Sequence, residues 1–279
     1  MSTGAMDELV APLCDLLVGR RFVALTGAGC STESGIPDYR GGGRTGPRNP
    51  IQHDAFLRRP EVRQRYWARA TLGWARFRAA EPNAAHRALA ALEAAGHLAG
   101  VITQNVDRLH RRAGSRRVVE LHGALAEVLC LGCGRGEDRD SVQARLLDAN
   151  PRWLEMAGEV QPDGDSDLPA DAVAGFAVVA CLSCGGELKP DVVFFGGNVP
   201  ERTLTAAWEV FAQGEALLVV GSSLTVYSGF RFVRRASELD LPIGVVNVGP
   251  TRADDLTHTK ICAPASEVLS NLERQLVRT

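Results

Sequence analysis

The sequence predicts an α/β protein in which a doubly wound parallel sheet carries a smaller inserted lobe. Two observations predict the sheet. Short, unbroken apolar segments alternate with helical segments, as parallel strands covered on both faces do. A glycine-rich loop follows the first apolar segment, at the position where open sheets of this kind bind ligands. The lobe is predicted because the alternation breaks twice, and the second break holds two Cys-x-x-Cys pairs.

The first elements are a helix and a buried strand. Apolar residues at 9, 10, 13, 16 and 17 fall on one helical face. The apolar run at 22–26 predicts the first strand. Residues 54–79 then carry apolar and aromatic side chains at helical spacing, and Pro82-Asn83 ends this block. It is expected to be a small helical insertion.

The strand and helix alternation resumes at residue 84. A helix is expected at 84–95, and further strands at 98–103, 118–121, 191–195, 216–220 and 243–247. Between 126 and 189 the alternation breaks again. The expected domains are therefore a nucleotide-binding domain made of residues 1–40, 84–125 and 190–279, and a small lobe made of residues 41–83 and 126–189.

The loop after the first strand predicts a nucleotide site, since glycines allow backbone N–H groups to approach a pyrophosphate. Thr32 stands where the usual dinucleotide motif has its third glycine, and no acidic residue follows about twenty positions on. A tight structural turn is the alternative interpretation of Gly27-Ala28-Gly29. The continuation through Ser34-Gly35-Ile36-Pro37-Asp38-Tyr39-Arg40 is more than such a turn needs.

Four of the seven cysteines form the pairs Cys130/Cys133 and Cys181/Cys184. Each pair sets two thiols on one tight turn, as a tetrahedral zinc site requires, and glycines at 132, 134, 185 and 186 suit such turns. Two redox dithiols are the alternative. A site with four thiolate ligands leaves no open position for water, so its zinc would hold the lobe together rather than take part in chemistry.

Composition narrows the class of partner. The 279 residues carry a formal net charge of −2, which gives no basis for attraction to nucleic acid. No apolar stretch is long enough for a spanning helix, and residues 1–9 resemble neither a secretory signal nor a transit peptide. We expect a cytoplasmic protein that binds neither nucleic acid nor membranes; its oligomeric state stays open, with a monomer favoured. Its only lysines are Lys189 and Lys260.

Seven blocks, in order, resemble the sirtuins, the NAD-dependent protein deacylases. They are the loop Gly27 to Gly41, Thr103-Gln104-Asn105-Val106-Asp107-Arg108-Leu109-His110, Leu121-His122-Gly123, the two cysteine pairs, Lys189-Pro190-Asp191-Val192-Val193-Phe194-Phe195-Gly196, Gly221-Ser222-Ser223-Leu224 and Asn247-Val248-Gly249. Within that family, residues 65–69, the long gap between the cysteine pairs and Phe194-Phe195-Gly196 look like the class II, sirtuin 4-like branch.

The resemblance implies a Rossmann-like fold and a set of roles. His122 is similar to the catalytic histidine that takes a proton from a ribose hydroxyl after the acyl oxygen has displaced nicotinamide, and Asn105 is implied beside it. The four cysteines would bind one structural Zn²⁺. The residues implied to bind NAD are Gly27, Ala28, Gly29, Ser31, Asp38, Tyr39, Arg40, Gln104, Asn105, Asp107, Gly221, Ser222, Ser223, Asn247, Val248, Gly249 and Ala265.

The implied activity is removal of acyl groups from protein lysines, with acylated proteins or peptides as substrates. The peptide is expected between the segment after Gly196 and the one around Leu224, although Gly197 stands where the family commonly has an acidic residue. Three alternatives remain open: a protein mono-ADP-ribosyltransferase at the same NAD site, a dehydrogenase, and a zinc module without catalysis.

Two residues are candidates for determining which acyl group the protein prefers. Tyr66 and Arg69 are three residues apart on an expected helix and share one face. Their spacing is similar to that of the pair that binds acidic acyl chains in the class III, sirtuin 5-like branch. Packing of Tyr66 in the small lobe, with Arg69 in solvent, is the alternative.

Overall fold

The computed structural model describes residues 3–36, 38, 50–156 and 173–277. The chain forms two compact units. The larger contains Met1–Tyr39, Glu81–Leu121 and Val199–Thr279, and the smaller contains Arg40–Ala80 and His122–Asn198. Within the described residues, no helix has the length and apolarity to cross a membrane.

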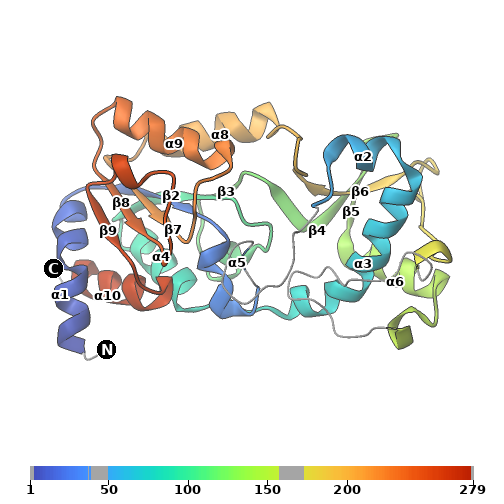
Figure 1. Ribbon diagram of the computed structural model, residues 1–279, viewed down its shortest axis with the longest axis horizontal. Coiled ribbons are helices and arrows are strands. Elements are labelled where there is room, and N and C mark those ends of the chain that lie inside the picture. The colour runs from blue at the N-terminus through green and yellow to red at the C-terminus, as the bar shows by residue number, and fades with distance from the viewer. Residues whose placement is uncertain (1–2, 37, 39–49, 157–172, 278–279) are drawn as a thin grey trace. The chain divides into compact units, whose positions relative to one another are not determined.

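The larger unit is built on a six-stranded sheet of order β3-β2-β1-β7-β8-β9, in which every neighbouring pair is parallel (Figure 1). The strands are β1 (Phe22–Thr26), β2 (Leu98–Thr103), β3 (Val118–Glu120), β7 (Ala216–Val220), β8 (Ile243–Val246) and β9 (Thr259–Ile261). From β1 the chain adds β2 and β3 on one side, and later adds β7, β8 and β9 on the other. The topological switch point therefore lies between β1 and β7.

Helices cover both faces of this sheet (Figure 1). The helices are α1 (Thr3–Leu17), α4 (Ala84–Ala94), α5 (Leu109–Arg112), α8 (Glu201–Phe211), α9 (Tyr227–Glu238) and α10 (Ala265–Val277). Phe22 and Ala24 pack into the core shared with α1, α4 and α10, whereas Val23 and Leu25 pack against α8 and α9. Because both faces are buried, β1 has no polar alternation, which is why its sequence is an apolar run.

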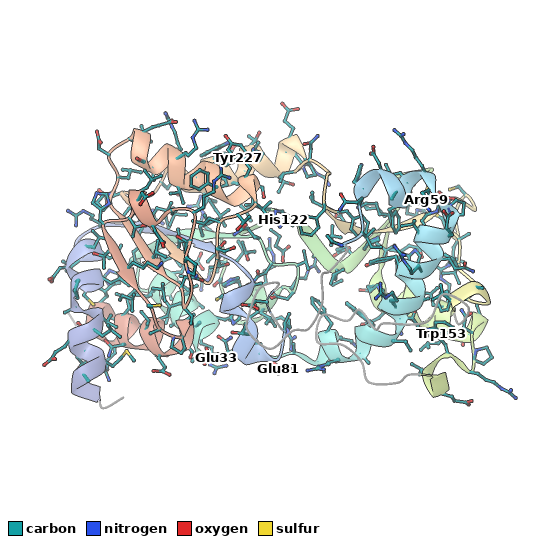
Figure 2. The ribbon with its side chains drawn as sticks, in the orientation of Figure 1. Glu33, Arg59, Glu81, His122, Trp153 and Tyr227 are labelled. Atoms are coloured by element: carbon teal, nitrogen blue, oxygen red, sulfur yellow. The ribbon has the colours of Figure 1, made fainter. Side chains whose placement is uncertain are left out.

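The smaller unit combines helices with a three-stranded antiparallel sheet of order β5-β4-β6. Its elements are α2 (His53–Arg58), α3 (Pro60–Ala79), β4 (Gly123–Cys130), β5 (Gly136–Asp138), α6 (Arg139–Ala149) and β6 (Leu188–Val192). Its core joins Trp67 and Leu72 of α3 with Trp153 and Phe176, and the Trp153 indole N–H donates to the Ala68 carbonyl (Figure 2). Buried Arg139 lies over the rings of both Trp67 and Trp74.

The sequence predicted the fold class correctly, with one strand misplaced. The run at 191–195 was expected in the parallel sheet, but the strand in this region is β6, which pairs with β4 in the small antiparallel sheet. Its alternating burial reflects that half-buried setting. β4, β5 and β9 were missed, and the helical block at 54–79 is divided into α2 and α3 at Arg59, directly before Pro60.

Candidate active site and metal centre

The loop after β1 lies against the loop after β7, at the switch point of the sheet. The Gly27 N–H donates to the Val220 carbonyl at 3.0 Å, and the Gly29 N–H donates to the Gly221 carbonyl at 2.8 Å. A Cβ on Gly29 would lie 2.9 Å from the Gly221 Cα, and a Cβ on Gly221 would lie 2.2 Å from the Cys30 nitrogen. These glycines are thus required by close packing between two loops, a reason that the motif alone did not supply.

Ser31 is the centre of a buried hydrogen-bond network in this loop. Its hydroxyl donates to Asp107 Oδ2 at 2.7 Å and accepts from Asn105 Nδ2 at 3.0 Å. The same Asn105 nitrogen donates to the Gly27 carbonyl at 3.0 Å. Ser31 is 1% exposed and Asn105 8%. The network therefore joins residues from the ends of β1 and β2 that the sequence assigned to one site.

Gln104 connects the end of β2 to the end of β7. Its side-chain Nε2 donates to Ser222 Oγ at 2.7 Å, and the Ser222 hydroxyl accepts from the Leu224 N–H at 3.2 Å. Gly229 in α9 makes room for this side chain, since a Cβ there would lie 2.6 Å from Gln104 Oε1. The backbone carbonyl of the next residue, Ser223, accepts a hydrogen bond from the Arg252 N–H.

Asp107 provides a carboxylate at the carboxyl edge of the parallel sheet, beside the switch point. Burial raises the pKa of its carboxyl above the ordinary value, although the Leu109 N–H and the Ser31 hydroxyl both donate to it and favour the ionised form. A carboxylate with two donors in a partly buried site can accept further hydrogen bonds from ligand hydroxyls. This property suits a ribose or an amide ligand.

The far end of the switch-point edge is formed by β8 and α10. Asn247 follows β8, and its side-chain amide donates to the Gly249 carbonyl at 2.8 Å across exposed Val248. Ala265 begins α10 and is buried. The Glu33 carboxylate of the β1 loop accepts from the Ser266 hydroxyl at 2.6 Å and from the Ser266 N–H (Figure 2). This contact fixes the β1 loop to the N-terminus of α10. Three more residues were expected to bind NAD. The structure describes Asp38, whereas Tyr39 and Arg40 lie outside the described residues.

His122 directly follows Leu121, whose N–H donates to the Thr103 carbonyl at the end of β2. The His122 carbonyl accepts from the Val193 N–H at 2.9 Å. Gly123 has φ +77°, and a Cβ there would lie 1.9 Å from the Asp191 carbonyl oxygen. From the sequence alone, this glycine was interpreted as leaving room for a ligand. The structure gives a different reason, which is the close crossing of β4 and β6 at the Gly123 and Val192 pair.

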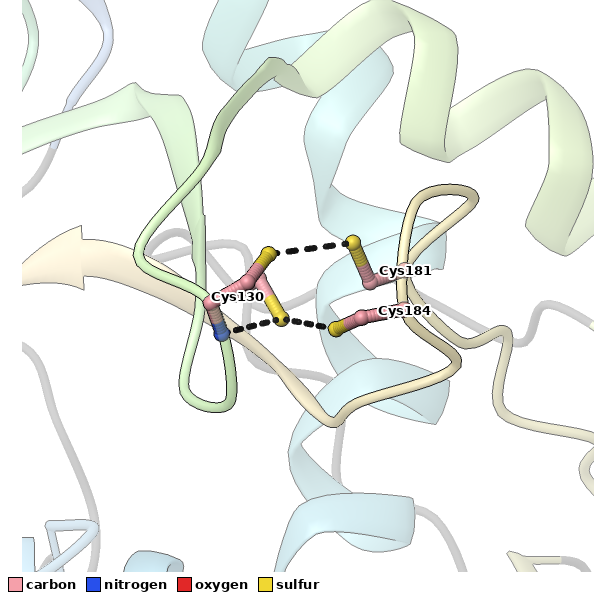
Figure 3. Close-up of side chains that lie close together, drawn as sticks. Cys130, Cys181 and Cys184 are labelled. Atoms are coloured by element: carbon pink, nitrogen blue, oxygen red, sulfur yellow. Dashed lines mark hydrogen bonds between the residues drawn. The ribbon is translucent and has the colours of Figure 1, made fainter.

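The four cysteines of the pairs come together at one point in the smaller unit (Figure 3). The Sγ atoms of Cys130 and Cys184 are 3.5 Å apart, and those of Cys133 and Cys181 are 3.9 Å apart. A tetrahedron with Zn–S bonds of about 2.3 Å has edges of about 3.8 Å. Because the short distances join one pair to the other, the arrangement is that of a single zinc site and not of two separate dithiols.

Backbone N–H groups surround these thiols as they do in zinc knuckles. The N–H groups of Gly132 and Cys133 point at Cys130 Sγ, and the Cys133 N–H in particular lowers the pKa of that thiol, whereas the pKa of Cys184, which shares a hydrogen bond with Cys130, is raised. Gly186 has no room for a side chain, because its Cβ would lie 3.0 Å from Cys130 Sγ. The site is therefore suited to hold thiolates around a cation.

Comparison with known proteins identifies the family. The model of the Sir2 family matches residues 27–228. The chain belongs to the Sir2 family. NAD-dependent protein deacetylase 2 of Bradyrhizobium diazoefficiens is 51% identical over 243 residues, covering 87% of this chain and 89% of that protein. NAD-dependent protein deacetylase 1 of Streptomyces coelicolor is 49% identical over 268 residues, covering 96% and 90%.

Solved structures of Sir2 proteins share the fold. One described as Sir2 bound to an acetylated peptide has a TM-score of 0.75 and 32% identity, covering 95% of this chain and 98% of the other. Another, Sir2Tm bound to a propionylated peptide, has the same score, identity and coverage. The parallel sheet with a separate small lobe is thus the Sir2 architecture.

The candidate acyl-binding pair of this Sir2 protein lies on α3. The Tyr66 ring makes edge contacts with Phe56, Trp67 and Phe194 at centroid distances of 5.5, 5.2 and 5.4 Å. Arg69 is half-buried on the same helix. The aromatic contacts are those that the packing alternative expects of Tyr66.

Sequence reasoning missed the second layer of polar residues behind the loop. Thr26 and Thr103, which end β1 and β2, are bonded to each other through their hydroxyls at 2.8 Å. His86 and His110 are buried beside them with ring centroids 4.7 Å apart. One signal was available: Asn83 three residues before His86 is a helix-capping pattern, and the structure contains this capping box.

Proposed function

We propose that this chain is an NAD-dependent protein-lysine deacylase, which releases nicotinamide and transfers the acyl group to ADP-ribose. The observation that carries the proposal is the position of the polar network. Ser31, Asn105 and Asp107 lie beside the interlocked glycine loops at the β1/β7 switch point, where sheets of this class bind nucleotides. The named deacetylase relatives, about half identical over most of the chain, support the reaction.

The residues present fit a dinucleotide. The loop at 27–31 offers backbone N–H groups in a short helical turn, Asp107 and Gln104 offer groups for ribose and amide contacts, and Asn247 offers an amide at the end of β8. NAD supplies a cationic leaving group when bound, so the protein chiefly has to orient the substrate, exclude water and remove a proton.

We assign proton removal to His122, because an imidazole titrates near neutral pH and this residue stands at the end of the β3 segment. Ser31 holds Asn105 and Asp107 in fixed orientations, so these two side chains present preset polar groups to the ligand. Residues 27–29, 221–223, 247–249 and Ala265, with Asp38, Tyr39 and Arg40, complete the proposed NAD contacts. The zinc site takes no part in the reaction and stabilises its lobe.

Two finer proposals concern the branch and the substrate. The Arg65-Tyr66-Trp67-Ala68-Arg69 segment and Phe194-Phe195-Gly196 support a class II, sirtuin 4-like assignment. Tyr66 and Arg69 of α3 are proposed to bind the terminal carboxylate of an acidic acyl chain, since an arginine fork binds carboxylates well. The domain division, the monomeric state and a cytoplasmic location expected from the sequence stay predictions.

Product analysis by mass spectrometry tests the function. The protein is incubated with NAD and peptides carrying acetyl-, succinyl- or hydroxymethylglutaryl-lysine, with His122→Ala as the control. Free lysine together with O-acyl-ADP-ribose is the expected result. ADP-ribose attached to protein would instead identify a mono-ADP-ribosyltransferase. Absence of nicotinamide release with every peptide would contradict catalysis altogether.

A further inference from the structure

Three buried side chains converge behind Ser31, and the proposed reaction does not use them. Cys30 and His110 are each 1% exposed, and His86 is fully buried. Their ligand atoms, one sulfur and two ring nitrogens, lie within 4.8 Å of one another. All three belong to the larger unit, and they come from the β1 loop, α4 and α5.

His110 presents an unused lone pair to this cluster. Its Nε2 is 2.8 Å from the Thr26 hydroxyl oxygen, and Thr26 gives its own proton to Thr103. Nε2 must therefore carry the ring hydrogen and donate to Thr26, which leaves Nδ1 as an acceptor. Within the described part of the chain, Nδ1 is buried and has no hydrogen-bond partner. A buried acceptor without a partner requires an explanation.

His86 is oriented through its other nitrogen. Nδ1 lies 3.3 Å from the Asn83 N–H and 3.0 Å from Asn83 Oδ1, so Asn83 can hold the ring in either tautomer. Nε2 lies 3.4 Å from Ser31 Oγ, which is longer than a good hydrogen bond. When Nδ1 carries the hydrogen and donates to Asn83 Oδ1, the Nε2 lone pair is available.

Both histidines thus have the pattern of metal ligands. In each ring one nitrogen is bonded by a neighbouring polar group, which leaves the other nitrogen to bind a metal, as outer hydrogen bonds fix ligating histidines. Burial lowers the pKa of His86 to about 4 and that of His110 well below its ordinary value, so both rings are neutral. Burial also raises the pKa of the Cys30 thiol, which keeps its proton until a cation replaces it.

The donor atoms decide between cations. The cluster offers one thiolate sulfur and two imidazole nitrogens, and, in addition to burial, the Asp107 carboxylate lies close enough to raise the pKa of the Cys30 thiol. Thiolate and imidazole are ligands that soft monovalent copper accepts. Three protein ligands with no exposed face suit an ion that needs no bound water.

We propose that Cys30 Sγ, His86 Nε2 and His110 Nδ1 form a second metal site, for one Cu⁺ ion, separate from the four-cysteine site. On binding, the S–H bond of Cys30 breaks, a Cu–S bond forms and the proton leaves to solvent, with no change of oxidation state. In the capping box His86 Nδ1 accepts from the Asn83 N–H, so Nε2 carries the ring hydrogen. On metal binding that hydrogen moves to Nδ1, which then donates to Asn83 Oδ1, and Nε2 binds the metal and loses its 3.4 Å contact with Ser31 Oγ. Cu⁺ therefore acts as a brake on turnover, a consequence that rests on the proposed function.

The test measures copper and zinc per chain in the zinc-loaded protein. Cu⁺ is supplied without oxygen from a chelator that buffers it, the protein is desalted, and both metals are determined. We expect one copper with zinc retained in the wild type, no copper in Cys30→Ala and Cys30→Ser, and one copper in Cys14→Ala. Cys14 is the matched control because it is a buried thiol in α1. Exposed Cys262 is present in all four proteins, so any copper that it binds contributes equally to each measurement.

X-ray absorption gives a readout independent of folding and activity. One sulfur and two nitrogens around copper are expected, whereas copper that had replaced zinc would show sulfur ligands only. Equal copper in the wild type and in both folded Cys30 variants, or loss of one zinc for each copper gained, would overturn the site. Nicotinamide release should fall by up to about tenfold at one copper per chain, because Ser31 loses its contact with His86 Nε2 and one hydrogen bond is worth at most about that factor. Copper bound without this decrease would overturn the brake alone.

Discussion

Replacement of Ser31 by alanine tests whether the buried network holds the site together. The hydroxyl donates to Asp107 at 2.7 Å and accepts from Asn105 at 3.0 Å. In Ser31→Ala, one carboxylate oxygen and one amide hydrogen lose their partner in a site where water does not easily replace it. Each such group costs about 1–3 kcal/mol, so with two groups we expect the β1 loop to lose about 2–6 kcal/mol of local stability.

Amide hydrogen exchange followed by mass spectrometry is the appropriate assay, since a chain with two compact units is not expected to unfold in one step. The peptide covering residues 27–36 should exchange at least about thirty-fold faster, the factor that corresponds to about 2 kcal/mol. Ser34→Ala is the matched control, because within the described residues the buried Ser34 hydroxyl oxygen has no hydrogen-bond partner. If the two variants exchange at equal rates, Ser31 does not hold the network.

Four further predictions follow from single residues. His122→Ala should lower nicotinamide release by about a hundredfold to ten-thousandfold while NAD binding, measured by calorimetry, is retained; near-normal turnover would refute the assignment. Cys181→Ser should lose zinc in metal analysis and make the smaller unit sensitive to protease; a fully active protein without zinc would contradict the structural role. Arg69→Met should reduce turnover of succinyl-lysine relative to acetyl-lysine by about tenfold or more, and an unchanged ratio would exclude Arg69 as the carboxylate ligand. Burial lowers the pKa of His86 from 6.5 to about 4, so the folded state binds fewer protons than the unfolded chain between these values. Its contribution of about 3 kcal/mol is complete above pH 6.5 and is lost as the pH falls toward 4. Comparing the hydrogen-exchange protection of α4 at pH 7 and pH 4.5 measures this loss of stability. In His86→Gln the protection should change less between the two pH values.

The sequence predicted most of the larger sheet because parallel strands buried on both faces are apolar runs. β1, β2 and β7 have no exposed residue, and their bounds agree with the predicted ones. β9 was missed because only Ile261 of its three residues is buried. The segment around Val192 was misassigned because an apolar run does not specify its partner strand, and pairing with β4 decides the sheet.

The candidate site was predictable where its residues are close in sequence. The glycine loop and the cysteine pairs are local patterns with fixed spacing, and resemblance supplied the rest. The contacts of Ser31 with His86 and Asp107 join segments 55 and 76 residues apart, and no local pattern specifies such contacts. The same holds for the unused nitrogen of His110, which depends on how two threonine hydroxyls share their protons.

Strand β4 joins the metal centre to the catalytic candidate by a single stretch of backbone. It begins at Gly123, next to His122, and ends at Cys130, a thiol of the metal centre, seven residues or about 23 Å along. Near the metal its pairing partner is Leu188, and at the other end it is Val192. The register of this pairing shifts between Gly123 and Val128, so a cation that clamps Cys130 to Cys184 acts on the far end through the backbone of β4 and not through one continuous register. A chelator would then be a remote inhibitor, reducing turnover without competing with either substrate, and metal availability would tune this enzyme through the alignment of one strand.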